Sequence, residues 1–181
     1  MRDIISKNIT WTKQRVSKVN ADKNEIECEN GDKITYDQIV FSSGLRMNWD
    51  KIKGAKEALE NPAAPVGSIY DLPFAEKTAK IGERFRGGRA IFTEPPMPIK
   101  CAGAPQKILY LWTSKWRKAN LPAEIEFYKS VGVMFGVPKY SEALIKVAAN
   151  YNIKTTFKHN LVEVTKDNVA IFENLDTKER V

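Results

Sequence analysis

Cys101 is the residue whose surroundings best fit nucleophilic or redox chemistry. It lies in the segment PMPIKCAGAPQK, where a short apolar strand ends and a helical pattern begins. The N-terminal end of a helix attracts anions, and Lys100 adds a positive charge, so both favour the thiolate, which is the nucleophilic form. Small residues at positions 102–104 leave room for a second reactant. A small buried filler is the alternative interpretation, because free cysteine is among the most buried residue types.

Cys28 and His159 also have side chains that could do chemistry, but we expect neither to be catalytic. Cys28 lies in an amphipathic hairpin strand between two glutamates and is predicted to be a buried structural thiol. His159, the single histidine, is predicted to lie in a solvated polar turn between strands. Two cysteines so far apart in sequence predict free thiols rather than a disulfide framework. The sequence contains no zinc-binding pattern, serine nucleophile elbow or P-loop, so we expect no metal site.

The residues around Cys101 predict a parallel βαβ unit. Residues 89–93 (RAIFT) predict a strand, and Pro105 then occupies a first helical position, which proline tolerates well. A second strand over residues 124–130 and a second helix over residues 140–150 follow. In parallel sheets of this kind ligands bind beyond the carboxyl ends of the strands, which is where Cys101 is expected. The helical residues expected to face inward are Ile108, Leu109, Leu111, Trp112, Trp116, Leu144, Ile145, Val147 and Ala148.

A dinucleotide site in this unit is not expected. Such a site needs a glycine-rich turn that places the pyrophosphate at the helix N-terminus. At that position the chain has Pro95, Pro96 and Pro98, which lack backbone N–H donors. The end of the second strand also lacks the carboxylate that would bind the ribose hydroxyls. We therefore expect no nicotinamide cofactor here.

Residues 9–44 predict a small antiparallel β-meander. The segments ITWTKQRVSKV, EIECEN and KITYDQIVFSSG have strand patterns, and Asn30-Gly31 is a strong hairpin signal. The apolar triplet at residues 39–41 predicts a strand buried in a parallel sheet. It ends at Ser42, Ser43 and Gly44, where hydroxyls and a glycine let a ligand approach the backbone. A plain turn is the alternative interpretation of these three residues.

The remaining segments define the expected domain division. Residues 45–67 look irregular and predict a crossing between domains, whereas residues 74–85 predict a helix that Gly87-Gly88 ends. The C-terminal segments IKTTF, NLVEV and NVAIFEN predict three short strands in antiparallel style. We expect two domains, residues 1–67 and 68–181, and an α/β fold class.

Composition excludes some functions. The net charge of +7 and pI of about 9.3 suit an anionic partner, but the lysines are spread along the chain among acidic residues. A nucleic-acid binding site is indicated by clustered basic residues rather than by total charge, so we predict a solvated basic surface. The two tryptophans of LYLWTSKWRKANL have helical spacing and predict core packing. The chain has no apolar run of membrane length and no secretory signal at its start.

Several segments resemble one flavoprotein family. AIFTEPPMPIKCAGAPQKILYL, FGVPKYSEAL and NLVEV…AIFENLD are similar to the sulfide:quinone oxidoreductases of mitochondrial type, which have two dinucleotide-binding domains. The resemblance extends from about residue 7 to residue 176, and KCAGAPQK is its most specific part. It implies a Rossmann-like βαβ unit of FAD/NAD(P)-binding type behind the β-meander.

The resemblance implies oxidation of hydrogen sulfide, with electrons passing through FAD to ubiquinone and the sulfane sulfur passing to glutathione or sulfite. Cys101 matches the first of two cysteines and would carry a persulfide or share a bridging sulfur with its partner. The site residues that it implies, besides Cys101, are the backbone of Val16 at the FAD adenine, Ser42, Ser43 and Gly44 near the flavin phosphate and ribose, and Pro98 and Lys100 on the sulfide side.

The chain also departs from the family pattern. The N-terminal GxGxxG fingerprint for FAD, the second cysteine and the C-terminal amphipathic segment that holds the enzyme on a membrane are missing from the sequence. We therefore expect a central fragment of a longer polypeptide that binds FAD poorly and is inactive alone. The family implies a peripheral location on the mitochondrial inner membrane and no nucleic-acid partner. A catalytically silent βαβ interaction module, or an RNA-binding module that uses the basic surface, is the alternative. A related flavoprotein disulfide reductase or nicotinamide dehydrogenase is a third possibility, which the proline-rich loop disfavours.

Overall fold

The computed structural model describes residues 5–181. The chain forms two compact units, one up to Gly44 and the other from Leu45 to Val181. The boundary between the compact units therefore falls at residue 44, whereas the sequence predicted a domain boundary at residue 67. Residues 45–67 pack with the second unit, and the boundary at residue 67 stays a prediction for the domains of a longer protein.

The first unit is an antiparallel sheet in the order β1-β2-β3, as the sequence predicted. Its strands are β1 (Val16–Asn20), β2 (Glu25–Cys28) and β3 (Lys33–Thr35), and the 3-10 helix η2 (Ala21–Lys23) joins the first two. The predicted hairpin at Asn30-Gly31 is confirmed: Gly31 has a φ of +87° and its N–H donates to the Cys28 carbonyl at 2.9 Å. This turn fixes the register of β2 with β3.

The predicted strand at residues 39–41 is wrong for this structure. Residues 39–48 have no regular structure, and Val40 and Phe41 are 89% and 66% exposed. A buried parallel strand needs a neighbour for its backbone groups and cover on both faces. The described residues of the first unit provide neither, so an apolar sequence alone does not make a strand here.

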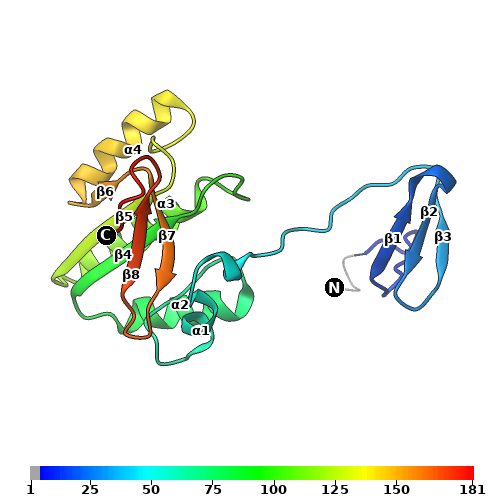
Figure 1. Ribbon diagram of the computed structural model, residues 1–181, viewed down its shortest axis with the longest axis horizontal. Helices are drawn as coiled ribbons and strands as arrows, with labels where there is room; N and C mark the ends of the chain where they lie inside the picture. Colours follow the sequence, from blue (N-terminus) through cyan, green and yellow to red (C-terminus); the bar gives the residue numbers. More distant parts are fainter. Residues whose placement is uncertain (1–4) are drawn as a thin grey trace. The chain divides into compact units, whose positions relative to one another are not determined.

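The second unit contains the predicted βαβ arrangement. Its parallel sheet has the order β4-β5-β6, with β4 at Gly88–Glu94, β5 at Ala123–Lys129 and β6 at Lys154–Thr156 (Figure 1). Helix α3 (Ala104–Lys118) connects β4 to β5, helix α4 (Pro138–Asn150) connects β5 to β6, and both have proline in the first turn. The expectation that all three C-terminal strands are antiparallel is wrong for β6, because α4 returns the chain to the amino end of the sheet.

One face of the parallel sheet and helix α3 enclose the core. Ile125 and Phe127, which alternate along β5, lie in one cluster with Leu109 and Trp116 of α3. Trp116 also donates its Nε1–H to the Gly82 carbonyl at 2.9 Å. Two residues that the helical spacing placed inward are exposed instead: Leu111 is 59% exposed and Ile145 is 48% exposed. Each helix contacts the sheet along a narrower stripe than the sequence suggested.

The opposite face of the parallel sheet carries a hairpin of β7 (His159–Val164) and β8 (Ala170–Asn174). The predicted solvated turn at His159 is wrong, because His159 is half-buried and pairs with Asn174 at the start of β7. The Tyr128 ring stacks on Phe172 with centroids 3.9 Å apart and an interplanar angle of 13°. On the same face Glu126 accepts two bonds from Arg89, at 2.7 and 3.0 Å, and one from the Tyr128 hydroxyl at 3.0 Å. These bonds lower the pKa of Glu126, the Arg89 hydrogen bond most, and they link β4 to β5.

The segment before the parallel sheet packs on the same unit. It contains the 3-10 helix η3 (Trp49–Lys51) and helices α1 (Ala55–Glu60) and α2 (Leu72–Arg84), the last confirming the helix predicted before Gly87-Gly88. Helix α1 packs against Val164 of β7. Lys77 of α2 donates its Nζ to the carbonyls of Ala58, Leu59 and Asn61 at 2.7–3.1 Å, which holds the end of α1 against α2.

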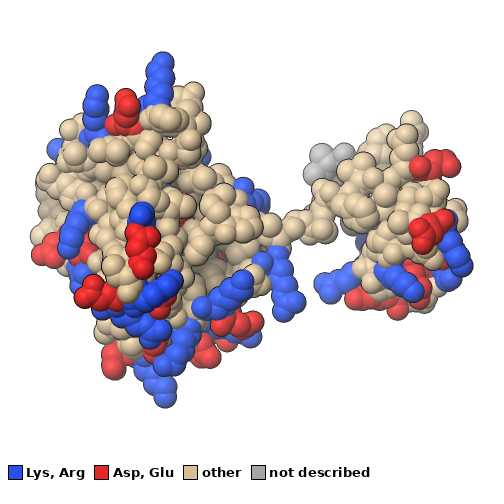
Figure 2. Space-filling model, turned by 45° about the horizontal axis from the view of Figure 1, so that its top comes forward, with Lys and Arg blue, Asp and Glu red and all other residues tan. Residues whose placement is uncertain are grey.

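The surface shows no large patch of one charge in the view of Figure 2, where Lys and Arg side chains lie among Asp and Glu. Within residues 5–181, no helix is long and apolar enough to span a bilayer. In the same described part, no three His, Cys, Asp or Glu side chains come together as metal ligands could.

Two leucines of α3 test the position of the core. Leu109 is fully buried and Leu111 is 59% exposed. Leu109→Ala is expected to lower the free energy of unfolding of the second unit by about 2–5 kcal/mol, because it leaves a cavity. Leu111→Ala, the matched control, should change it by less than about 0.5 kcal/mol. Urea unfolding followed by circular dichroism measures both, and equal losses would place the core elsewhere.

Candidate functional site

The loop between β4 and α3 carries three of the predicted site residues. Residues 95–103 follow the carboxyl end of β4, at the edge where parallel sheets bind ligands. Pro98, Lys100 and Cys101 are all exposed on this loop. The Cys101 thiol is therefore accessible, and its alternative interpretation as a buried filler is wrong. Cys28, in contrast, is only 3% exposed and is the structural thiol that the sequence predicted.

Cys101 lies directly before helix α3. Its carbonyl accepts a hydrogen bond from the Ala104 N–H at 3.1 Å, which turns the chain into the helix. The N-cap is Gly103, which has no side chain to bond the first-turn amides. Pro105 and Gln106 are buried in the first turn, and the Gln106 side-chain amide donates to the Met134 carbonyl, which holds the helix start against the loop after β5. The predicted order of loop, thiol and helix N-terminus is thus confirmed.

Tyr70 is a site residue that sequence reasoning missed. Its hydroxyl donates to the Cys101 carbonyl at 3.3 Å, although the two residues are 31 positions apart. Burial raises the pKa of Tyr70, and the nearby charges of Cys101 and Glu94 raise it further. The phenol therefore stays a neutral donor at physiological pH. No sequence pattern links Tyr70 to Cys101, because only the fold brings the segment before α2 next to this loop.

A buried ion pair lies at the start of the loop. Glu94 ends β4, Lys129 ends β5, and the Lys129 Nζ contacts Glu94 Oε2 directly. Their side chains are 3% and 1% exposed. Burial lowers the pKa of Lys129, and the hydrogen bond to Glu94 opposes that shift. The sequence analysis considered the end of β5 only for the carboxylate that residues 128–130 lack. The pattern that could have predicted the ion pair is a charged residue at the end of each strand, Glu94 in β4 and Lys129 in β5.

The remaining predicted site residues lie in the first unit. Val16 of β1 is 46% exposed, and Ser42, Ser43 and Gly44 are exposed in the segment after the meander. Gly44 has a φ of +79° and open space where a side chain would be. These accessible hydroxyls and amides suit the polar parts of a nucleotide such as FAD. None of these positions is a glycine-rich phosphate turn, and their assignment to an FAD site stays a prediction.

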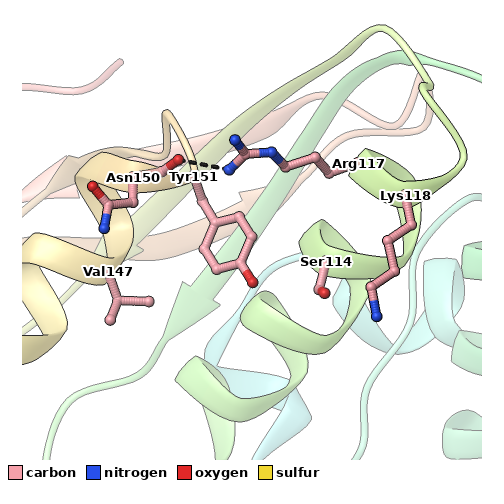
Figure 3. Close-up of a pocket in the computed structure, with 6 residues that line it drawn as sticks. All are labelled: Ser114, Arg117, Lys118, Val147, Asn150 and Tyr151. Atoms are coloured by element: carbon pink, nitrogen blue, oxygen red, sulfur yellow. Dashed lines mark hydrogen bonds between the residues drawn. The ribbon is translucent and has the colours of Figure 1, made fainter.

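A surface groove of 530 Å³ lies between the C-terminal ends of α3 and α4 (Figure 3). Arg117 donates its Nη1 to the Asn150 carbonyl at 2.8 Å and lies over the Tyr151 ring at 5.6 Å. Basic side chains at helix C-termini complement the helix dipole, so this contact fastens the two helix ends. Because both helices end at the amino edge of the sheet, the groove is not part of the Cys101 site. Its lining residues are Ser114, Arg117, Lys118, Val147, Asn150 and Tyr151.

Comparison with solved structures shows the class of fold. A chain in the mitochondrial ATP synthase structure of Tetrahymena thermophila aligns with a TM-score of 0.70 and 20% identity, over 93% of this chain and 43% of that one. The sulfide:quinone oxidoreductase of Aquifex aeolicus gives 0.72 and 19%, over 94% and 39%. A ferredoxin reductase of Rhodopseudomonas palustris gives 0.60 and 11%, over 93% and 38%. At these identities the likeness shows the fold alone, which is that of FAD/NAD(P)-binding flavoproteins.

Sequence comparison then gives the family. No family model matches the chain. The mitochondrial sulfide:quinone oxidoreductase of Mus musculus is 39% identical over 176 residues, which are 96% of this chain and 39% of that protein. The protein of the same name in Dictyostelium discoideum is also 39% identical, over 95% of this chain and 38% of its own length. The chain is a relative of the mitochondrial sulfide:quinone oxidoreductases, as the segment around Cys101 predicted, and it spans about two fifths of their length.

The raised pKa of Tyr70 predicts a pH effect. The fold favours the neutral phenol, so its contribution to stability is complete below the ordinary pKa of 10.0 and is lost as the pH rises through the higher folded value. Between about pH 9 and 11 the wild-type chain should therefore lose more stability than Tyr70→Phe. Urea midpoints measure both, with Tyr140→Phe as an exposed control. Equal losses in the wild type and Tyr70→Phe would contradict this prediction.

Proposed function

We propose that this chain is the part of a sulfide:quinone oxidoreductase that holds the first of two sulfur-reactive cysteines, Cys101. The observation that carries the proposal is the accessible thiol on the loop before α3, in a chain 39% identical to the mouse enzyme. A cysteine kept only for packing would be buried, as Cys28 is. The small residues that follow Cys101 leave its sulfur open to a second reactant.

The proposed reaction begins with a disulfide between Cys101 and a second cysteine in the remainder of the protein. Hydrosulfide attacks the Cys101 sulfur, so the disulfide breaks, a persulfide forms on Cys101 and the second cysteine leaves as a thiolate. Glutathione or sulfite then takes the outer sulfur and leaves Cys101 as a thiolate. Re-forming the disulfide releases two electrons. The chemistry that FAD supplies when bound is acceptance of these electrons and their delivery to ubiquinone.

The chain's own residues have distinct parts in this proposal. Lys100, exposed beside Cys101, attracts the hydrosulfide anion, and Pro98 shapes the sulfide side of the loop. The Val16 backbone and the polar groups of Ser42, Ser43 and Gly44 contribute to the FAD site. The rest of that site and the second cysteine belong to the length of the relatives that this chain does not span, so we expect the chain alone to bind FAD weakly and not to turn over.

The proposed location is the mitochondrion, because the mouse and Dictyostelium relatives are both named mitochondrial. A quinone is dissolved in the bilayer, so the enzyme would act as a peripheral protein at the inner membrane. The nucleic-acid alternative gains no support from the face shown in Figure 2, where basic and acidic side chains are mixed.

The reactivity of Cys101 tests the proposal. Inorganic polysulfide should transfer one sulfur atom to the Cys101 thiolate, because the thiolate can attack a sulfane sulfur and release a polysulfide that is one atom shorter. Intact-mass and peptide mass spectrometry should show the mass of one sulfur on Cys101 and none on Cys28. Iodoacetamide should alkylate Cys101 at about neutral pH several-fold faster in the folded chain than in urea.

Cys101→Ser is the control and should abolish both modifications without changing stability. If folded Cys101 reacts no faster than the unfolded thiol and accepts no sulfur, the redox proposal fails and a catalytically silent interaction module becomes the better assignment.

A further inference from the structure

The geometry points to the ion pair of Glu94 and Lys129 as a positioning device for the loop that carries Cys101. This inference rests on the proposed function of Cys101 and adds two residues to it. Neither residue touches the sulfur, so both act through the loop.

The pair joins the ends of two strands at the start of the loop. Glu94 and Lys129 lie directly opposite each other in the parallel register of β4 with β5. Their charged ends are in contact and almost completely buried. Residue 95 begins the loop, so the backbone direction at Glu94 sets the direction in which the loop leaves the sheet.

The pair lies on the α3 side of the sheet. Side chains alternate along a strand, so Lys129 shares a face with Phe127, and its Nζ is 4.9 Å from the centroid of that ring. Phe127 belongs to the core cluster that contains Leu109 of α3. The two charges therefore end the apolar layer beneath α3, at the edge where the Cys101 loop and the start of that helix lie.

The backbone of the loop is held at both ends. Ser130 donates its N–H and its hydroxyl to the Glu94 carbonyl, at 3.1 and 3.0 Å. At the other end Tyr70 donates to the Cys101 carbonyl at 3.3 Å. Glu94 is thus fixed by its side chain and by its carbonyl, and the six residues from Pro95 to Lys100 span two anchored ends.

Stability alone does not account for a buried pair at this position. Removing two charges from water is unfavourable, and well-packed apolar residues in place of such pairs are often equally stable. The strands β4 and β5 are already linked on the other face by Arg89 and Glu126. A salt bridge is directional and therefore fixes the orientation of both side chains, which an apolar pair does not. Such fixing matters near a reactive group, because that group must be held within about half an ångström of its productive position.

The test compares substitutions at the two pairs. Lys129→Met, Glu94→Gln and the double variant remove the pair at the loop. Arg89→Gln, the matched control, removes the link between the same strands away from the loop. For each folded variant the measurements are the alkylation rate of Cys101, the urea midpoint, and amide hydrogen exchange of Ser130 and Ala104. The N–H groups of Ser130 and Ala104 donate to the Glu94 and Cys101 carbonyls, so their exchange reports the protection of the loop ends.

Each single variant leaves one buried charge without its partner, which destabilises the fold. The double variant removes both charges, so it provides the test even where a single variant does not fold. In the double variant, exchange of the Ser130 and Ala104 amides should rise about tenfold or more, and alkylation of Cys101 should fall at least about threefold towards the rate of the unfolded chain. Arg89→Gln should change neither. Restoring a charged pair of reversed order, Glu94→Lys with Lys129→Glu, should recover part of the protection of the loop.

The two proposals fail in different ways. A wild-type Cys101 that reacts like an unfolded thiol overturns the proposed function, whatever the loop does. A reactive wild-type Cys101 whose rate and loop protection are unchanged in a folded double variant overturns the positioning role. An equal change in Arg89→Gln also overturns it, because the effect would then be general loosening of the sheet.

Discussion

The parallel pairing of β4 with β5 is the constraint on which the second unit depends. Seven consecutive residue pairs, from Gly88 with Ala123 to Glu94 with Lys129, fix where both strands end. That register aligns Phe92 with Phe127 in the core and places the two charged residues at the same edge. The loop with Cys101 and the start of α3 follow from that edge, so the position of the thiol depends on strand register.

The loop itself combines features that would be unfavourable in a nucleotide site. Pro95, Pro96 and Pro98 remove backbone donors, and the helix behind them begins after a glycine that cannot cap it with a side chain. The free thiol of Cys101 is exposed on the loop that leads into this helix. The βαβ unit, which binds a pyrophosphate in dinucleotide-binding proteins, is thus compatible here with sulfur chemistry.

The first unit shows how much a strand depends on its surroundings. The β1-β2-β3 meander forms from residues close in sequence, because its turns and cross-strand pairs are local. The apolar residues 39–41 have no partner strand among the described residues of this unit and stay exposed. The curated relatives are about two and a half times as long, so the proposed FAD site would draw on more chain than is present here.

The sequence by itself determined the elements whose signals are local: the Asn30-Gly31 hairpin, and the strand and helix on either side of Cys101. It left open whether the Cys101 thiol is exposed or buried, which only the structure decided. It could not determine which residues meet across elements. Tyr70 reaches Cys101, and Glu94 reaches Lys129, only because the packing of α2 and the register of the sheet bring distant segments together. Burial of Leu109 but not Leu111 was likewise decided by packing, since periodicity gives a helix face and tertiary contact selects the part of it that is covered.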